Sequence, residues 1–230
     1  MLLSSQPVFT PANLYGMSAW YDATQQATGA VSSWTDQSGF GNHATQSTGA
    51  QQPVCTTNQL NGKNVILFTA SSNQTLVVPS SVYPVAAGSN TLFAVCKRNT
   101  EAGNIQLVIN GGLGAGSTVY GLYYEAAAGT ATYRQNGLCQ TTGNTNTNYN
   151  VFTGSFDGTV VLSQSVNNAG TITNNNGGVE TLVNMHIGSE TASGLYLDGG
   201  IAEIIIYKRL LSASEITVIT QYLSNKWRVP

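Results

Sequence analysis

Short apolar or alternating runs, separated by Gly, Asn, Ser and Thr, follow one another along most of the chain. Alternation places successive side chains on opposite faces of an extended strand, and turn residues between such runs are typical of antiparallel sheets. The run at 91–98 is apolar on both faces, so we expect it in the interior. The pattern predicts strands at 17–22, 31–36, 43–46, 64–69, 75–78, 91–98, 105–110, 119–125, 131–135, 150–156, 159–166, 185–189, 195–197 and 200–208. Many short strands of this kind predict an all-β sandwich or jelly roll.

One helix is predicted at the end of the chain. Ser212 and Glu215 have the spacing of a capping box, in which each side chain satisfies a free backbone amide at the helix start. The residues that recur at helical spacing and form an apolar face are Ile216, Ile219, Leu223 and Trp227. We expect this face to pack on the sandwich beside the strand at 200–208, with Trp227 as a structural residue.

The first 13 residues are predicted to form an extended arm, because Pro7 and Pro11 prevent a helix and make a central strand improbable. The arm either lies on its own domain, which we favour, or docks on a partner. Residues 14–230 are expected to form a single domain, a common size for an all-β sandwich. The apolar side chains of the arm are Leu2, Leu3, Val8 and Phe9.

The composition excludes some classes of function. Only 8% of the residues are charged, compared with about 25% in ordinary domains, and the net charge is −2. The basic residues are scattered, so we expect no nucleic-acid binding. The sequence shows neither a signal peptide nor an apolar run of about 18 residues, which predicts a chain without leader or membrane insertion. The odd number of cysteines leaves at least one thiol of Cys55, Cys96 and Cys139 unpaired, and Cys96 is expected to be buried and free.

Residues 31–44 are rich in residue types that favour turns. Asp36 can accept hydrogen bonds from the backbone two residues on, and Gly39 and Gly41 allow a positive φ. We interpret this stretch, with Trp34, as a structural corner. Glu203, flanked by isoleucines, is expected to be buried and bonded to this corner, because a buried carboxylate without partners is costly.

Several short motifs occur in a fixed order along the chain: 17–22 (Met-Ser-Ala-Trp-Tyr-Asp), 33–39 (Ser-Trp-Thr-Asp-Gln-Ser-Gly), 41–44, 52–53, 60–65, 68, 187–188, 200–207, 211–216 and 222–227. They resemble the concanavalin A-like lectin/glucanase superfamily, and most closely the laminin G-like (LamG-type) domains of bacterial and phage proteins. The resemblance implies a jelly roll of two antiparallel sheets, but it implies no activity, since the fold hosts many functions.

The residues do not favour an enzyme. A glycoside hydrolase needs two facing carboxylates, which the glucanase branch of the superfamily supplies as Glu-x-Asp-x-x-Glu. No two of the ten acidic residues here are separated by two residues, so that motif is absent. His43 and His186 are interpreted as hydrogen-bonded strand histidines rather than members of a catalytic triad.

Two kinds of ligand, calcium and a sugar, are considered from the residues. No cofactor is required, but calcium is kept as an optional ligand because some relatives bind it, and the hard oxygen ligands offered here are Asp36, Asn42 and Asp198. For Asp36, capping its own turn is the simpler interpretation. A sugar platform could be built on neighbouring strands from Tyr120, Tyr124, Tyr133 and Arg134, although alternation requires some of these rings to be core.

Three functions are carried forward. The first is a non-enzymatic protein of the virion surface, a phage capsid decoration or tail-associated protein, with other virion proteins as partners and glycans as further ligands. The second is a carbohydrate-binding or adhesion module of an extracellular bacterial protein. The third, with least support, is a glycoside hydrolase.

Overall fold

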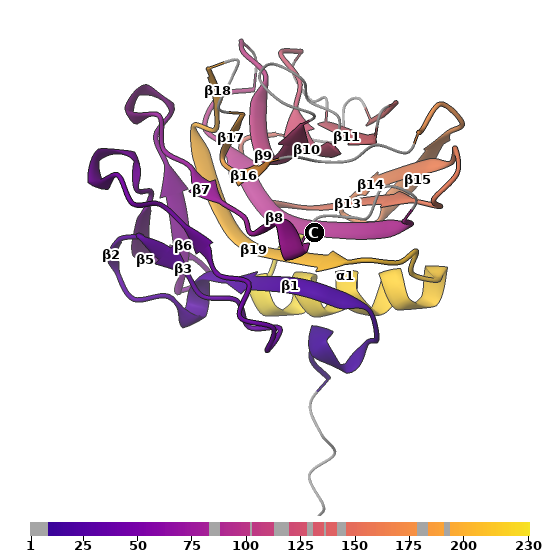
Figure 1. Ribbon diagram of the computed structural model, residues 1–230, viewed down its shortest axis with the longest axis horizontal. Coiled ribbons are helices and arrows are strands. Elements are labelled where there is room, and N and C mark those ends of the chain that lie inside the picture. The colour runs from indigo at the N-terminus through magenta and orange to yellow at the C-terminus, as the bar shows by residue number, and fades with distance from the viewer. Residues whose placement is uncertain are drawn as a thin grey trace, which may run out of the picture.

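A computed structural model of the chain describes residues 9–82, 88–101, 103–112, 120–127, 131–135, 137–141, 146–178, 184–190 and 194–230, without the side chains of 131, 132, 134, 135 and 184. Two antiparallel sheets face each other, and one helix lies on the outer side of the larger sheet, below β1 and β19 (Figure 1). The all-β sandwich with a C-terminal helix is therefore confirmed.

The larger sheet is organised around β19, whose nine residues are all buried. One edge of β19 pairs with β8, while its other edge pairs first with β6 and then with β1. In spatial order the strands are β15 (Ala169–Asn174), β14 (Leu162–Val166), β13 (Asn150–Phe156), β8 (Asn90–Arg98), β19 (Gly199–Tyr207), β6 (Lys63–Phe68), β5 (Val54–Leu60) and β2 (Gly29–Ala30), with β1 (Met17–Asp22) beside β19.

The second sheet covers the inner face of the first (Figure 1). Its strands in spatial order are β12 (Leu138–Thr141), β11 (Ala131–Gln135), β10 (Tyr120–Tyr124), β9 (Gln106–Gly112), β16 (Asn184–Ile187), β7 (Leu76–Val77), β4 (Ala44–Thr45) and β3 (Ser33–Trp34). A small hairpin joins β17 (Ser189–Glu190) to β18 (Leu195–Tyr196). Single 3-10 turns occur at Pro11–Asn13 (η1), Ala23–Gln25 (η2), Gly49–Gln51 (η3), Ala70–Ser72 (η4) and Ser80–Val82 (η5).

Four strands, β2, β5, β12 and β15, were not predicted. Two of them belong to tight hairpins with recognisable turns. Asn61 and Gly62 have φ of 50° and 73° between β5 and β6, and Asn167 and Asn168 have φ of 54° and 55° between β14 and β15. Paired positive φ values fit the two-residue turns that match strand twist, so the Asn-Gly and Asn-Asn pairs were the missed signal.

The helix α1 (Ala213–Trp227) begins as predicted, with Ser212 and Glu215 forming the capping box. Its buried residues are Ile219, Thr220, Leu223 and Trp227, so the expected apolar face packs on the sandwich. Among the described residues, no helix is long and apolar enough to cross a membrane.

The end of the arm that the structure describes lies on its own domain. The Phe9 ring is 6.3 Å from the ring of Tyr222 on α1, and the Tyr207 hydroxyl donates to the Pro11 carbonyl oxygen at 2.7 Å. Leu2, Leu3 and Val8 lie outside the described residues. The thiols of Cys55, Cys96 and Cys139 are all free and buried.

Candidate functional site

The 31–44 turn is held by the carboxylate of Asp36. Its Oδ1 accepts hydrogen bonds from the backbone N–H groups of Trp20 and Ser38, both at 2.9 Å. Its Oδ2 accepts from the Ser38 hydroxyl at 2.6 Å and from the Asn42 N–H at 2.9 Å. With four donors already bound, this carboxylate acts as the cap of its own turn.

Other residues of the turn are also fixed by local contacts. Trp34 is fully buried, and its ring lies 5.7 Å from the ring of Tyr21. The φ angles of Gly39 and Gly41 are 89° and 72°, in the region that favours glycine. His43 accepts the Asp36 N–H on Nδ1 at 3.0 Å, a structural role for this histidine.

Glu203 is fully buried, but its contacts differ from those expected. Its carboxylate accepts from Nε1 of Trp20 and of Trp227, both at 2.6 Å, and from Nζ of Lys226 at 2.7 Å. The expected contact with the 31–44 turn was wrong. Because Lys226 and Trp227 belong to α1, the Glu203 side chain points to the face that α1 covers.

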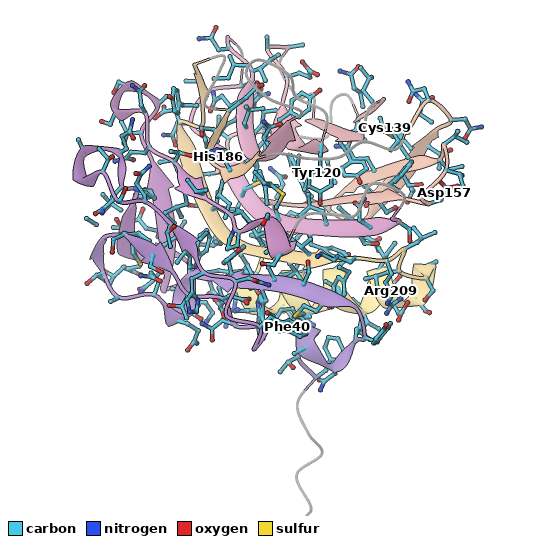
Figure 2. The ribbon with its side chains drawn as sticks, viewed as in Figure 1. Phe40, Tyr120, Cys139, Asp157, His186 and Arg209 are labelled. Atoms are coloured by element: carbon cyan, nitrogen blue, oxygen red, sulfur yellow. The ribbon has the colours of Figure 1, made fainter. Side chains whose placement is uncertain are left out.

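The tyrosine platform predicted for sugar binding was also wrong. Tyr120, Tyr124 and Tyr133 are fully buried, and the Tyr124 ring lies 4.9 Å from Phe152 of the opposite sheet. Alternation along β10 and β11 turns these rings inward, into the layer between the sheets. Figure 2 shows Tyr120 in this layer. The side chain of Arg134 lies outside the described residues.

The three oxygen ligands considered for calcium are not brought together. The Asp198 N–H donates to Oε1 of Gln106 at 3.0 Å, and its carboxylate accepts from Nδ2 of Asn99 at 3.3 Å. Asp36 and Asn42 lie together in the 31–44 turn instead, where the Asn42 N–H donates to Asp36. In the described part of the chain, no group of three or more His, Cys, Asp or Glu side chains could hold a metal ion.

His186, labelled in Figure 2, is buried together with Thr75 and Ser189. Its Nδ1 is 3.4 Å from Oγ1 of Thr75, which is 2.6 Å from the Ser189 hydroxyl. Burial lowers the pKa of His186, so the ring is neutral at pH 7. These hydroxyls face one another rather than solvent, which does not suit a nucleophile.

A polar hollow that sequence reasoning missed lies where several distant segments meet. We call it the asparagine groove; its volume is about 640 Å³ and it is lined by Leu60, Lys97, residues 146–150, Asn167 and residues 228–230. These residues come from the ends of β5 and β8, the segment before β13, the β14–β15 turn and the chain after α1. The cluster of asparagines between 144 and 150 was the available signal.

The amides of the groove are fixed by one another. Oδ1 of Asn146 accepts from the Asn148 N–H at 2.8 Å, and Nδ2 of Asn150 donates to the Asn148 carbonyl at 2.8 Å. Oδ1 of Asn150 accepts from Nδ2 of Asn167 at 2.9 Å. The exposed side-chain amide of Asn148 makes no hydrogen bond to a described residue, so it is available to a ligand.

A second hollow, the aromatic cleft, has a volume of about 460 Å³ and is lined by Ala12, residues 14–17, Ser38, Phe40, Lys208 and Arg209. Tyr15 and Phe40 are 87% and 68% exposed, which is unusual for large apolar side chains. Nε of Arg209 donates to the Tyr15 carbonyl at 2.7 Å, and its guanidinium pairs with Glu215. Figure 2 shows Phe40 and Arg209 near β1 and α1.

No family model matches the sequence, and no curated protein matches it. Solved structures do share the architecture. The binding domain of Paraclostridial Mosquitocidal Protein 1 matches with a TM-score of 0.65 and 12% identity, over 94% of this chain and 55% of that one. The likeness shows the fold, a two-sheet β-sandwich.

Two further structures have a similar sandwich. A Trypanosoma rangeli sialidase in complex with 2,3-difluoro-KDN has a TM-score of 0.61 and 14% identity, over 99% of this chain and 36% of that one. The binding domain of Botulinum Neurotoxin DC in complex with SialylT has a TM-score of 0.61 and 8% identity, over 91% and 52%. This chain thus spans about a third to a half of these structures, and the low identities show the fold alone.

Proposed function

We propose that this chain is a non-enzymatic, lectin-like module of the LamG type that binds carbohydrate in the asparagine groove. The observation that carries the proposal is the fixed amide wall beside the unbonded amide of Asn148. Amides both donate and accept hydrogen bonds, as sugar hydroxyls require, and a fixed wall loses little entropy on binding. The ligands named for the sialidase and the neurotoxin binding domain support the same choice.

Catalysis has less support, because the paired carboxylates of Asp22 and Glu203 are buried and closed to a substrate. Lys226 bridges Asp22 and Glu203 with Nζ–O distances of 2.6 and 2.7 Å, and both carboxylates are buried. A glycosidase needs its two carboxyl groups on either side of an accessible bond. This pair instead joins the sheet to the helix.

A glycan array, read with and without calcium, tests the proposed function. We expect wild-type protein to bind a defined set of glycans, and Asn148→Ala to weaken binding about three- to tenfold through loss of one or two hydrogen bonds. Phe40→Ala, in the aromatic cleft, is the matched control and should bind like wild type. Absence of any bound glycan would refute the proposal, and a loss confined to Phe40→Ala would move the site to the aromatic cleft.

The aromatic cleft favours a second candidate, an attachment protein of the virion surface whose partners are other virion proteins. Exposed aromatic rings are enriched where proteins bind one another, and Tyr15 follows the arm directly in sequence. The chain should then co-sediment with the virus particle in a fixed copy number, and Tyr15→Ser with Phe40→Ser should release it. Unchanged sedimentation of that double variant would count against attachment through this cleft.

A further inference from the structure

Two of the basic side chains line the asparagine groove. The chain has eight Lys and Arg residues. Arg209 pairs with Glu215, and Lys226 pairs with Asp22 and Glu203. Within the described residues, Lys97 and Arg228 form no ion pair, yet both line the groove, and no acidic side chain lines it. Among the side chains that line the groove, two are therefore cationic and none is acidic.

The two cations reach the groove from separate elements. Lys97 lies near the end of β8, opposite Gly200 of β19, and its Nζ sits 5.4 Å from the centre of the Tyr149 ring. A side-chain Cβ at position 200 would lie 2.3 Å from the Tyr149 hydroxyl, so glycine there gives the ring its place. The ring in turn supports the Lys97 ammonium through a cation–π contact.

Arg228 is held at the end of α1. It has a left-handed φ of 51° and caps the helix, while the next residue, Val229, is buried. The exposed guanidinium thus extends from an anchored backbone. Asn148 lies in the same groove as both cations.

We infer that the ligand of the asparagine groove is an acidic carbohydrate, whose carboxylate or sulfate group is bound by Lys97 and Arg228; this inference rests on the proposed function. A guanidinium binds such planar or tetrahedral oxyanions through two parallel hydrogen bonds, and charge-assisted hydrogen bonds are about twice as strong as neutral ones. The amide of Asn148 then contacts the neutral hydroxyls of the same sugar.

An isolated acidic group fits the groove better than a polyanion. A nucleic acid needs many phosphate contacts, each supplied by a basic side chain. Two of the remaining cations are held elsewhere by carbonyl oxygens: the Arg98 guanidinium is buried and donates to the Glu125 carbonyl at 2.7 Å, and Lys208 donates to the Ser81 carbonyl. The groove therefore offers one anion subsite rather than a charged track.

Matched neutral and acidic probes test the inference. Isothermal titration would compare lactose with 3′-sialyllactose and with 3′-sulfated lactose, at 50 and 500 mM NaCl. Wild-type protein should prefer at least one acidic member by tenfold or more, and the preference should shrink at high salt because mobile ions screen the charges.

Variants assign the preference to the two cations. Lys97→Gln and Arg228→Gln should each weaken the acidic probe about tenfold and leave the neutral probe unchanged. Lys97→Arg should retain most of the affinity. Lys63→Gln is the matched control, because Lys63 also has no ion pair among the described residues but does not line the groove. Melting curves of all variants would show that folding is intact.

The outcomes separate the inference from the proposed function. If neutral and acidic probes bind equally well, or if the Gln variants retain the acidic preference, the inference is wrong, while Asn148-dependent glycan binding would still stand. If no carbohydrate binds at all, the proposed function fails and this inference fails with it.

Discussion

Lys226 is predicted to be the residue on which the junction of helix and sheet depends most. Its ammonium contacts the carboxylates of Asp22 and Glu203 at 2.6 and 2.7 Å, and the Tyr222 hydroxyl at 3.1 Å. Lys226→Met keeps much of the aliphatic stem and removes the charge. Asp22 retains its bonds to Thr24, but the fully buried Glu203 loses its cation.

The cost of this change follows from burial. Removing one partner of a buried ion pair costs about 3–5 kcal/mol, because the remaining charge is uncompensated. For a chain of this length, each kcal/mol of lost stability lowers Tm by about 2–4 °C, so we expect the Tm of Lys226→Met to decrease by roughly 6–20 °C. The same substitution at Lys63, which forms no ion pair among the described residues, should change Tm by less than about 2 °C.

The loss of stability in Lys226→Met should also depend on pH. Burial raises the pKa of Glu203, and the Lys226 ammonium opposes that rise. A carboxyl whose folded-state pKa is raised contributes stability that is fully present below its unfolded pKa, about 4.3, and lost as pH rises through the folded pKa. Lys226→Met raises that pKa further. The destabilisation should therefore be larger at pH 8 than at pH 5.

Urea denaturation at pH 5 and pH 8 measures both effects. Lys226→Met combined with Glu203→Gln should recover part of the stability at pH 8, because the fully buried side chain at position 203 is then neutral. A decrease below about 1 kcal/mol at pH 8, or a loss that is larger at pH 5, would refute the ion-pair account of this junction.

Further substitutions elsewhere in the fold also have defined outcomes. Trp227→Phe removes the Nε1 donor to Glu203 at 2.6 Å but keeps an aromatic ring, and should cost about 1.5–3 kcal/mol in urea denaturation; no measurable loss would contradict that bond. Asp36→Ala should cost at least about 2 kcal/mol by the same assay and leave glycan affinity unchanged. Asp36→Asn should cost less, because one acceptor oxygen remains. Altered glycan affinity at unchanged stability would restore a binding role for Asp36. Gly121→Ala should cost more than about 3 kcal/mol of stability, since φ is 137° and the added Cβ would lie 2.0 Å from a carbonyl oxygen. Gly29→Ala places its Cβ where no atom lies within 4 Å, so it should cost less. Equal melting temperatures for the two variants would contradict this expectation.

Local sequence patterns were sufficient for most of the fold. The capping box at Ser212 and Glu215 and the apolar spacing of α1 depend on neighbours in the chain, so the helix could be predicted closely. The long buried strands β8 and β19 were recognised for the same reason. The strand expected at 159–166 begins only at Leu162, because the Asp157 carboxylate accepts three backbone N–H groups between 159 and 161 and forms a turn first.

The site depends on contacts that no local pattern records. Alternation identifies two faces of a strand but not which face is inner, so it could not show which rings of β10 and β11 are core. Glu203 was expected to be buried, yet the element covering its face could not be identified. The asparagine groove brings Leu60, Lys97, Asn148 and Arg228 together from distant parts of the chain, and their meeting follows from sheet topology alone.

The central claim is that carbohydrate binds in the asparagine groove, and a titration followed by ¹⁵N NMR tests it most directly. With the highest-affinity glycan from the array, the account predicts that shift changes concentrate at the side-chain amide of Asn148, the backbone of residues 146–150 and the signals of Lys97 and Arg228. Changes that concentrate instead at Tyr15 and Phe40, or a spectrum that saturating glycan leaves unchanged, would contradict the claim.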